Sequence, residues 1–319
     1  MSESRSPKPK IAIACQGGGS HTAFTAGALK RLLSRGGEYD FVGFSGASGG
    51  AICALLSWYG FLSGGAGRAS ELLDSFWREN SASDYWDMVS NELFVEGSRA
   101  AGLVAVPEVS PYLYPSLAKN RLRRMLEDHV DFGRVGELSA SEDSPELLVS
   151  AVEVRSGEFK IFRGSEVTVD AMLASTAIPN LFRAVRINGG TYWDGLFSQN
   201  PPVREFLRGY GEAHRKPDEI WVIQVNPQKR ASEPTSMLDI LDRRNELAGN
   251  LSLNQEVDSI ETINRLLPHL PEDEYKKIRV RRIEMTRNLD AASKLDRSPS
   301  FIKEMMRYGE ERGEEFLVH

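Results

Sequence analysis

The chain has 319 residues, of which 41% are hydrophobic and 26% charged, and its formal net charge is −6. This length and composition suffice for a globular core of ordinary size. The acidic balance, without any basic stripe, argues against general nucleic-acid binding, for which an excess of Lys and Arg is expected. The two cysteines, Cys15 and Cys53, lie in apolar runs without metal-ligand spacing, so we expect no disulfide, no metal site and no cofactor.

The first residues are polar and lack the apolar stretch of a secretory signal, so residues 1–9 are expected to form a disordered tail. The longest apolar run, residues 51–62, is too short to cross a bilayer, which takes about 20 residues. The sequence therefore predicts a cytoplasmic protein whose contact with a membrane would be peripheral. The apolar stretch 102–107, with Tyr112, Leu113 and Tyr114 after it, is the candidate for surface docking or an acyl pocket.

Residues 10–16 form an apolar run that predicts a buried strand, and Gly17-Gly18-Gly19-Ser20-His21 follows it directly. A helix with Phe24 on its apolar face comes next. Three glycines between a strand and a helix expose consecutive backbone N–H groups, which can hold a carboxylate, a phosphate or a tetrahedral oxyanion. A nucleotide-binding loop is the competing interpretation, but neither of the two common glycine signatures is present. A plain flexible turn is the other alternative.

The next apolar run, residues 39–44, leads into Gly46-Ala47-Ser48-Gly49-Gly50, which is a Gly-x-Ser-x-Gly elbow. Small residues two before and two after the serine let the chain turn sharply from strand into helix. The turn exposes the Ser48 hydroxyl at a helix N-terminus, whose dipole favours a developing alkoxide. Ser48 is therefore the candidate nucleophile, with an ordinary turn between a strand and a buried helix as the alternative.

A third motif comprises residues 174–182, which read Ala-Ser-Thr-Ala-Ile-Pro-Asn-Leu-Phe, and Asp194-Gly195 after a hairpin signal at residues 188–190. Taken in order, the glycine loop, the serine elbow and this motif resemble the patatin-like phospholipase family. The stretch Asn200-Pro201-Pro202-Val203 matches as well, so the resemblance covers residues 10–226. An ordered set of motifs is much more specific than any one of them.

The resemblance implies a serine acyl hydrolase that cleaves fatty acyl esters of lipids through a Ser48/Asp194 dyad and an acyl-enzyme. The expected oxyanion hole consists of the backbone N–H groups of Gly17, Gly18 and Gly19. Two other readings stay open. One is an esterase or depolymerase for another hydrophobic ester, such as a polyhydroxyalkanoate; the other is a catalytically idle lipid-binding protein.

Aspartate is a weak base at its ordinary pKa of about 3.9, so a dyad requires burial of Asp194 to raise that pKa. A Ser-Asp-His triad is the alternative, because Ser48, Asp194 and His214 stand in the chain order of an α/β-hydrolase. However, His214 lies in a very polar stretch that predicts an exposed loop. His21 occupies a position where the family usually has an arginine, and it fits packing or helix capping better than proton transfer.

The alternation of elements predicts a single α/β domain: a three-layer α/β/α fold with a mostly parallel central sheet. We assign residues 10–227 to the catalytic domain and residues 228–319 to a helical C-terminal extension packed on the same domain, because no linker separates them. Within the extension, the pattern predicts a long helix at 237–267, a strand at 277–285 and a terminal helix at 301–316. The oligomeric state cannot be inferred from these patterns.

Overall fold

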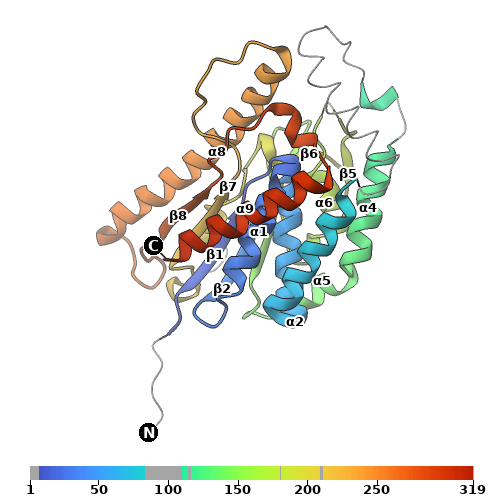
Figure 1. The fold of residues 1–319 in the computed structure, drawn as a ribbon. Coiled ribbons are helices and arrows are strands. Elements are labelled where there is room, and N and C mark those ends of the chain that lie inside the picture. The colour runs from blue at the N-terminus through green and yellow to red at the C-terminus, as the bar shows by residue number, and fades with distance from the viewer. Residues whose placement is uncertain (1–6, 83–109, 114–115, 180, 209–210, 319) are drawn as a thin grey trace.

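The computed structural model describes residues 7–82, 110–113, 116–179, 181–208 and 211–318. Within these ranges the chain forms one eight-stranded sheet, with the order β5-β6-β3-β2-β1-β7-β8 and with β4 paired to β3 (Figure 1). The run from β3 through β2, β1 and β7 to β8 is parallel, whereas β4, β5 and β6 pair antiparallel. The strands are β1 (Lys10–Cys15), β2 (Asp40–Gly46), β3 (Glu146–Glu153), β4 (Phe159–Arg163), β5 (Val185–Ile187), β6 (Gly190–Asp194), β7 (Glu219–Gln224) and β8 (Arg279–Glu284).

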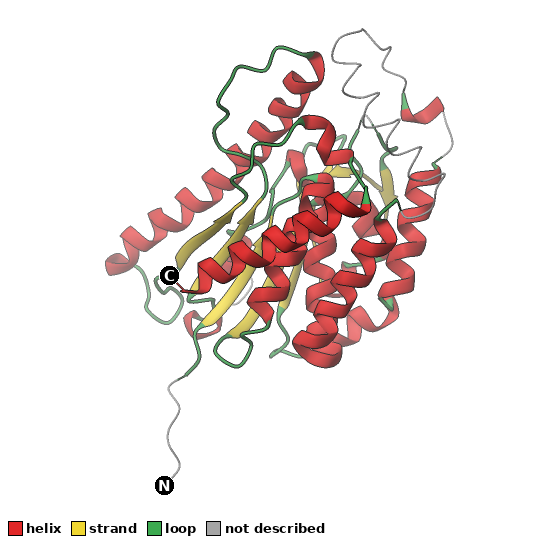
Figure 2. Ribbon diagram, in the orientation of Figure 1, coloured by secondary structure: helices red, strands yellow, loops and turns green. Residues whose placement is uncertain are grey.

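Helices cover both faces of this sheet (Figure 2). Those on one face, chiefly α1, α2 and α9, share a hydrophobic core with the sheet, and α7 and α8 enclose a second core on the other face. The predicted three-layer fold with a mostly parallel sheet is confirmed. The helices are α1 (Thr22–Leu33), α2 (Ser48–Asn80), α4 (Leu117–His129), α5 (Phe132–Leu138), α6 (Val169–Ser175), α7 (Glu205–Arg208), α8 (Met237–Leu266) and α9 (Pro299–Val318).

The first strand, β1, lies inside the sheet between β2 and β7. Its side chains alternate between the two cores: Ile11, Ile13 and Cys15 point to the first, and Ala12 and Ala14 to the second. A parallel strand buried on both faces must be apolar along its whole length. This explains why residues 11–15 form an unbroken apolar run rather than an alternating one.

The parallel direction of β1, β2 and β7 brings the loops that follow them to one edge of the sheet. Cys15 pairs with Gly46, and the N–H of Gln16 donates to the carbonyl of Ile223, so the three strands end at the same level. Ligand sites of open α/β sheets form at this carboxyl edge. The glycine loop and the serine elbow therefore meet there although they are separate in sequence.

The long helix α2 consists of two parts. The backbone is non-helical at Gly64 and Gly65, with φ +75° at the latter, and the chain bends there. The chain thus forms two helical segments here, joined across this kink. The first part is almost entirely buried against the sheet, which fixes the orientation of its N-terminal residue, Ser48.

The C-terminal segment contributes β8 to the sheet and α9 to one helical layer. Helix α9 crosses α1 at backbone contact, because each helix presents a glycine to the other. A Cβ on Gly27 would lie 1.9 Å from the carbonyl oxygen of Met306, and one on Gly309 would lie 2.0 Å from that of Phe24. Any side chain at either glycine would push the two helices apart.

In the described part of the chain, no helix combines the length and apolarity needed to cross a bilayer. Most of the predicted tail, residues 1–6, and the apolar stretch 102–107 lie outside the described residues. Of the aromatic and aliphatic residues predicted to accompany that stretch, Tyr112 is 57% exposed and Leu113 is 78% exposed.

Candidate active site

Ser48 is the first residue of α2 and follows β2 by a single residue. Its φ of 54° lies in the left-handed region, which residues other than glycine rarely adopt. The glycines on either side permit this turn: a Cβ on Gly46 would lie 2.5 Å from Ala51 N, and one on Gly50 would lie 2.3 Å from the carbonyl oxygen of Cys15. The Gly-x-Ser-x-Gly pattern is therefore a steric requirement of this turn.

A residue of the third motif holds the elbow in place. Ser175, the last residue of α6, is fully buried, and its Oγ accepts a hydrogen bond from the N–H of Ser48 at 3.1 Å. The motif match at residues 174–182 gave this serine no role. The contact fixes the backbone of Ser48, and it also removes that N–H from the donors that could face a substrate.

Asp194 lies at the end of β6, and strand pairing through β3 places it near the elbow. Val149 of β3 pairs with Gly46, and Ala151, two residues further on, pairs with Asp194 of the antiparallel β6. The following residue must be glycine, because a Cβ on Gly195 would lie 2.2 Å from Ser150 Oγ. The hairpin of β5 and β6 thus returns the aspartate to the level of the serine.

The carboxyl of Asp194 is fully buried and only half satisfied. One oxygen, Oδ1, accepts from the N–H of Leu196 at 2.8 Å, whereas Oδ2 has no hydrogen-bond partner among the described residues. Burial raises the pKa of Asp194 to about 7, although the hydrogen bond from the Leu196 N–H and the nearby Ser48 hydroxyl lower it in part. At neutral pH this carboxyl is therefore close to half-protonated, unlike an exposed aspartate.

The glycine loop packs directly on Ser48. A Cβ on Gly17 would lie 2.8 Å from the Cβ of Ser48, and the Gly17 N–H donates to Asn200 Oδ1 at 2.7 Å. The N–H groups of Gly18 and Gly19, in contrast, donate to none of the described residues. Gly17 could join an oxyanion hole only by leaving Asn200, whereas Gly18 and Gly19 already have free donors.

His214 does not belong to this site. Its side chain is 72% exposed, and its carbonyl oxygen accepts from the Lys10 ammonium at 2.7 Å. Lys10 begins β1, whereas the elbow lies at the end of β2 beside it, so the two sites are a full strand apart, about 20 Å. The Ser48-Asp194-His214 triad is thereby excluded.

His21 lies beside the glycine loop and is buried, with 2% of its surface exposed. Its Nε2 is 2.7 Å from Ser293 Oγ, and its Nδ1 has no hydrogen-bond partner among the described residues. Burial, together with the nearby Lys294, lowers the pKa of His21 to about 3. The imidazole is therefore neutral at pH 7, and its side chain makes no capping hydrogen bond to α1.

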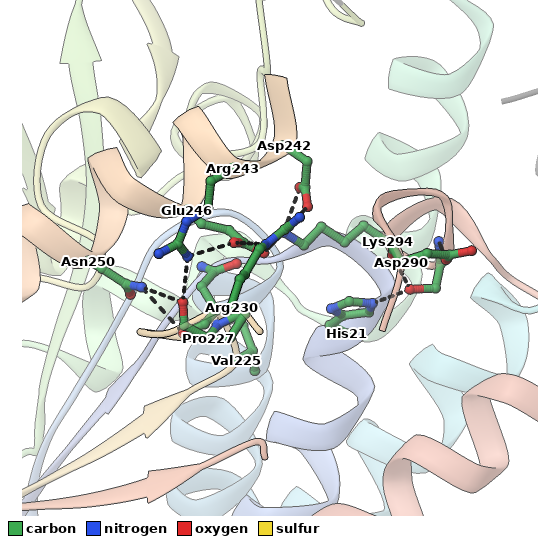
Figure 3. A network of polar contacts seen from close by, with 12 residues as sticks. His21, Val225, Pro227, Arg230, Asp242, Arg243, Glu246, Asn250, Asp290 and Lys294 are labelled. Atoms are coloured by element: carbon green, nitrogen blue, oxygen red, sulfur yellow. Dashed lines mark hydrogen bonds and ion pairs between the residues drawn. The ribbon is translucent and has the colours of Figure 1, made fainter. Parts of the chain in front are cut away.

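Near His21 lies a group of charged side chains that we call the charge cluster: Arg230, Asp242, Arg243, Glu246 and Lys294 (Figure 3). Arg230 and Lys294 each bind both acids, and Arg243 binds Glu246. Glu246 is 2% exposed, and burial by itself would raise its pKa, but hydrogen bonds and charges of the three cations lower it to about 2. The sequence patterns gave no indication of this cluster.

Within the described ranges, neither a metal site nor a ligand cavity adds to the candidate site. No group of three or more His, Cys, Asp or Glu side chains that could hold a metal occurs in the part of the chain that the structure describes. A cavity of about 530 Å³ lies between α2 and α4. It is lined mostly by charged side chains and includes neither Ser48 nor Asp194, so it does not belong to the candidate site.

Comparison with solved structures finds similar chains of bacterial origin. VipD from Legionella pneumophila shares 13% identity at a TM-score of 0.45, over 98% of this chain and 67% of that one. The type III effector protein ExoU shares 15% identity at a TM-score of 0.40, over 98% of this chain and 54% of that one. A chain of the ExoU–SpcU complex from Pseudomonas aeruginosa shares 14% identity at a TM-score of 0.41, over 99% of this chain and 52% of that one. The protein thus spans about half the length of the last two.

In sequence, a search of curated proteins finds no match. One family model does match, that of the patatin-like phospholipases, over residues 13–207. The match includes the glycine loop, the elbow, the third motif and Asp194, and it covers more than half of the 319 residues.

Proposed function

The chain belongs to the patatin-like phospholipase family, and on this basis we propose that it hydrolyses fatty acyl esters of lipids through a Ser48/Asp194 dyad. The observation that carries the proposal is a nucleophile on a strained elbow beside a buried aspartate whose pKa is about 7. A general base is most effective when its pKa lies near the working pH, since it is then substantially ionised and still a good proton acceptor. An aspartate with this pKa can act as the general base, a role that histidine takes in many hydrolases.

In the first half of the reaction, Ser48 Oγ attacks the ester carbonyl carbon and its proton passes to Oδ2 of Asp194, the oxygen without another partner. The free N–H groups of Gly18 and Gly19 stabilise the oxyanion of the tetrahedral intermediate. When the intermediate collapses, the bond to the alcohol oxygen breaks and the alcohol leaves with the proton held by Asp194. The acyl chain stays on Ser48 as an ester.

In the second half, a water molecule attacks the acyl carbon and gives a proton to Asp194. The Ser48 oxygen then leaves, takes that proton back, and the fatty acid is released. Gly17 serves this scheme as the anchor of the loop, since its N–H is bound to Asn200. Removing one oxyanion donor costs on the order of 10²–10³-fold in comparable sites, so the loop is as important to the rate as the dyad.

A lipid substrate, rather than a small soluble ester, is supported by apolar side chains exposed around the site. Phe197, three residues after Asp194, is 40% exposed. Helix α8 contacts the segment of Phe197, and one side of its first half carries four large apolar residues that are 41–65% exposed. These are Met237, Ile240, Leu247 and Leu251. Exposed apolar surface of this kind is typical of contact with a lipid surface or another apolar partner.

The test is fatty-acid release from mixed phospholipid vesicles in the presence of a metal chelator. Wild-type protein is compared with Ser48→Ala and with a matched control, Ser57→Ala, which removes a buried hydroxyl of the same helix that has no hydrogen-bond partner. We expect release by the wild type and by Ser57→Ala, and none by Ser48→Ala. A short-chain chromogenic ester is assayed in parallel.

Three results would overturn parts of the proposal. Cleavage of the chromogenic ester through Ser48 without release from vesicles would keep the dyad and replace phospholipid by another hydrophobic ester. Absence of activity on both substrates would leave a lipid-binding protein without catalysis. Activity that survives in Ser48→Ala would reject the nucleophile itself.

A further inference from the structure

The C-terminal segment touches the glycine loop at two points. The short helical turn η7 (Ala291–Leu295) packs against η1 (Gly19–His21), and His21 and Ser293, 272 positions apart in sequence, are in hydrogen-bond contact. A Cβ on Gly19 would lie 2.4 Å from the carbonyl oxygen of Lys294. The backbone of Lys294 is thus the surface against which Gly19 rests.

The direction of the side-chain contact follows from proton counting. Ser293 Oγ donates its only proton to the carbonyl oxygen of Asp290, at 2.5 Å. Towards His21 it can therefore only accept, so the neutral imidazole carries its proton on Nε2 and donates it to Ser293. His21, the residue before α1, is thus linked to η7 by a hydrogen bond of defined direction and not by packing alone.

The turn η7 is itself held by the charge cluster. The ammonium of Lys294 donates to Asp242 at 2.7 Å and to Glu246 at 3.0 Å, and both acids belong to α8. The members of the cluster are only 2–16% exposed. Water and salt screen such partly buried pairs much less than surface pairs, so this tether is stiffer than an exposed ion pair.

Building on the proposed function, we propose that Lys294 is a positioning residue for the oxyanion hole. Its ammonium, held by Asp242 and Glu246, fixes η7, and η7 in turn holds the backbone of Gly19 and the ring of His21. Glycines have the greatest conformational freedom of all residues, so the loop needs such external support to keep its free N–H groups in one place. A displacement of about 1 Å in a catalytic site can cost about 10²-fold in rate.

The charge balance makes Lys294→Met a clean test. Without Lys294 the cluster keeps two cations, Arg230 and Arg243, and two anions, Asp242 and Glu246, so no buried charge is left unpaired. Methionine also retains most of the apolar stem. The conservative variant Lys294→Arg restores the cation. Lys303→Met, at an exposed position of α9, is the control for the loss of a lysine outside the charge cluster.

The measurement is kcat and KM for a short-chain ester, together with amide hydrogen exchange of residues 17–22. We expect Lys294→Met to lower kcat about 10-fold or more, to change KM less than about twofold, and to speed exchange in the loop. Lys294→Arg should recover most of the kcat, and Lys303→Met should equal the wild type. A loss confined to stability would leave the kcat of the folded fraction unchanged.

Wild-type kcat and wild-type exchange in Lys294→Met would overturn the positioning role. Failure of the proposed function gives a different result: the wild type itself would not cleave the ester, or Ser48→Ala would cleave it equally well. In that case the exchange experiment decides by itself whether Lys294 holds the loop, since faster exchange only in Lys294→Met supports the tether and unchanged exchange rejects it.

Discussion

Two buried carboxylates near the glycine loop, Asp194 and Glu246, have opposite protonation behaviour. Asp194 is fully buried without a cation among the causes of its shift, and burial raises its pKa to about 7. Glu246 is nearly as buried, but Arg230, Lys294 and Arg243 offset the burial and lower its pKa to about 2. Burial alone therefore does not tell a reactive acid from a structural one. The partners decide, and only the carboxyl that lacks cations can exchange a proton near pH 7.

The largest expected effect is that of Asp194→Asn, which keeps the shape of the reactive carboxyl and removes its basicity. We expect kcat for ester hydrolysis to fall about 10²–10⁴-fold, because in the proposed mechanism proton transfer in both half-reactions passes through this group. The measurement is steady-state hydrolysis of a chromogenic ester, with circular dichroism to show that the variant folds. Full activity in a folded Asp194→Asn protein would rule out the dyad.

The same variant should be more stable than the wild type at pH 8. The folded pKa of about 7 lies above the ordinary 3.8, so the folded protein binds this proton more tightly than the unfolded chain. The ionised carboxyl therefore destabilises the folded protein. This loss of stability is absent below pH 3.8, grows between pH 3.8 and 7, and is constant above pH 7 at about 4 kcal/mol at most. Urea unfolding at pH 8 and at pH 4 should show a gain only at pH 8. An equal gain at both would contradict the raised pKa.

Glu246→Gln is the complementary change in the charge cluster, and here stability should be lost. Arg230 and Lys294 would then share Asp242, and Arg243 would lose its ion pair with Glu246. Breaking a buried ion pair from one side costs about 3–5 kcal/mol. Urea unfolding at pH 7 measures the loss. Asp258→Asn, at an exposed position of the same helix, is the matched control and should change stability by less than about 0.5 kcal/mol. If Glu246→Gln and Asp258→Asn changed the free energy of unfolding equally, the charge cluster would not stabilise the fold.

A mild change of pH should separate the two carboxylates without mutation, and this is the smallest effect. As pH falls below 7, Asp194 becomes protonated and kcat/KM should drop about tenfold per pH unit. Glu246 stays ionised: its lowered pKa gives stability that is complete above pH 4.5 and is lost only as pH falls towards 2. Activity should thus change with pH between pH 5 and 8, whereas the difference in free energy of unfolding between wild type and Glu246→Gln should stay constant. A flat activity profile over this range would refute the assignment of the base.

The sequence predicts the fold and the position of the elbow well, because these depend on local patterns. The apolar run of β1 and the glycines around Ser48 report burial and turn geometry within a few residues. The hairpin that delivers Asp194 was also visible, from Asn188 and Gly189, both of which have positive φ. These features are each determined by neighbours in the chain.

The supports of the site could not be predicted, because each joins residues far apart in sequence. Ser175 binds the N–H of Ser48 across 127 positions, and Asn200 binds that of Gly17 across 183. Both lie in stretches that match the family, so a motif marked them, but no periodicity or composition could supply the contact. For Lys294 no signal exists at all: it is one of several lysines in a polar segment, and only the fold shows that it meets Gly19.

The central place of β1 has a consequence for how the protein is made. This strand is synthesised before the other strands of the sheet, yet one of its edges stays unpaired until β7 emerges about 200 residues later, which takes roughly 10–40 s at ordinary rates of translation. During that time the nascent chain presents an apolar strand with open N–H and C=O groups, the kind of edge that pairs with other chains. Folding that must wait for such distant partners is slow. Expression at reduced temperature or with a chaperone should therefore raise the yield of soluble protein, whatever its substrate.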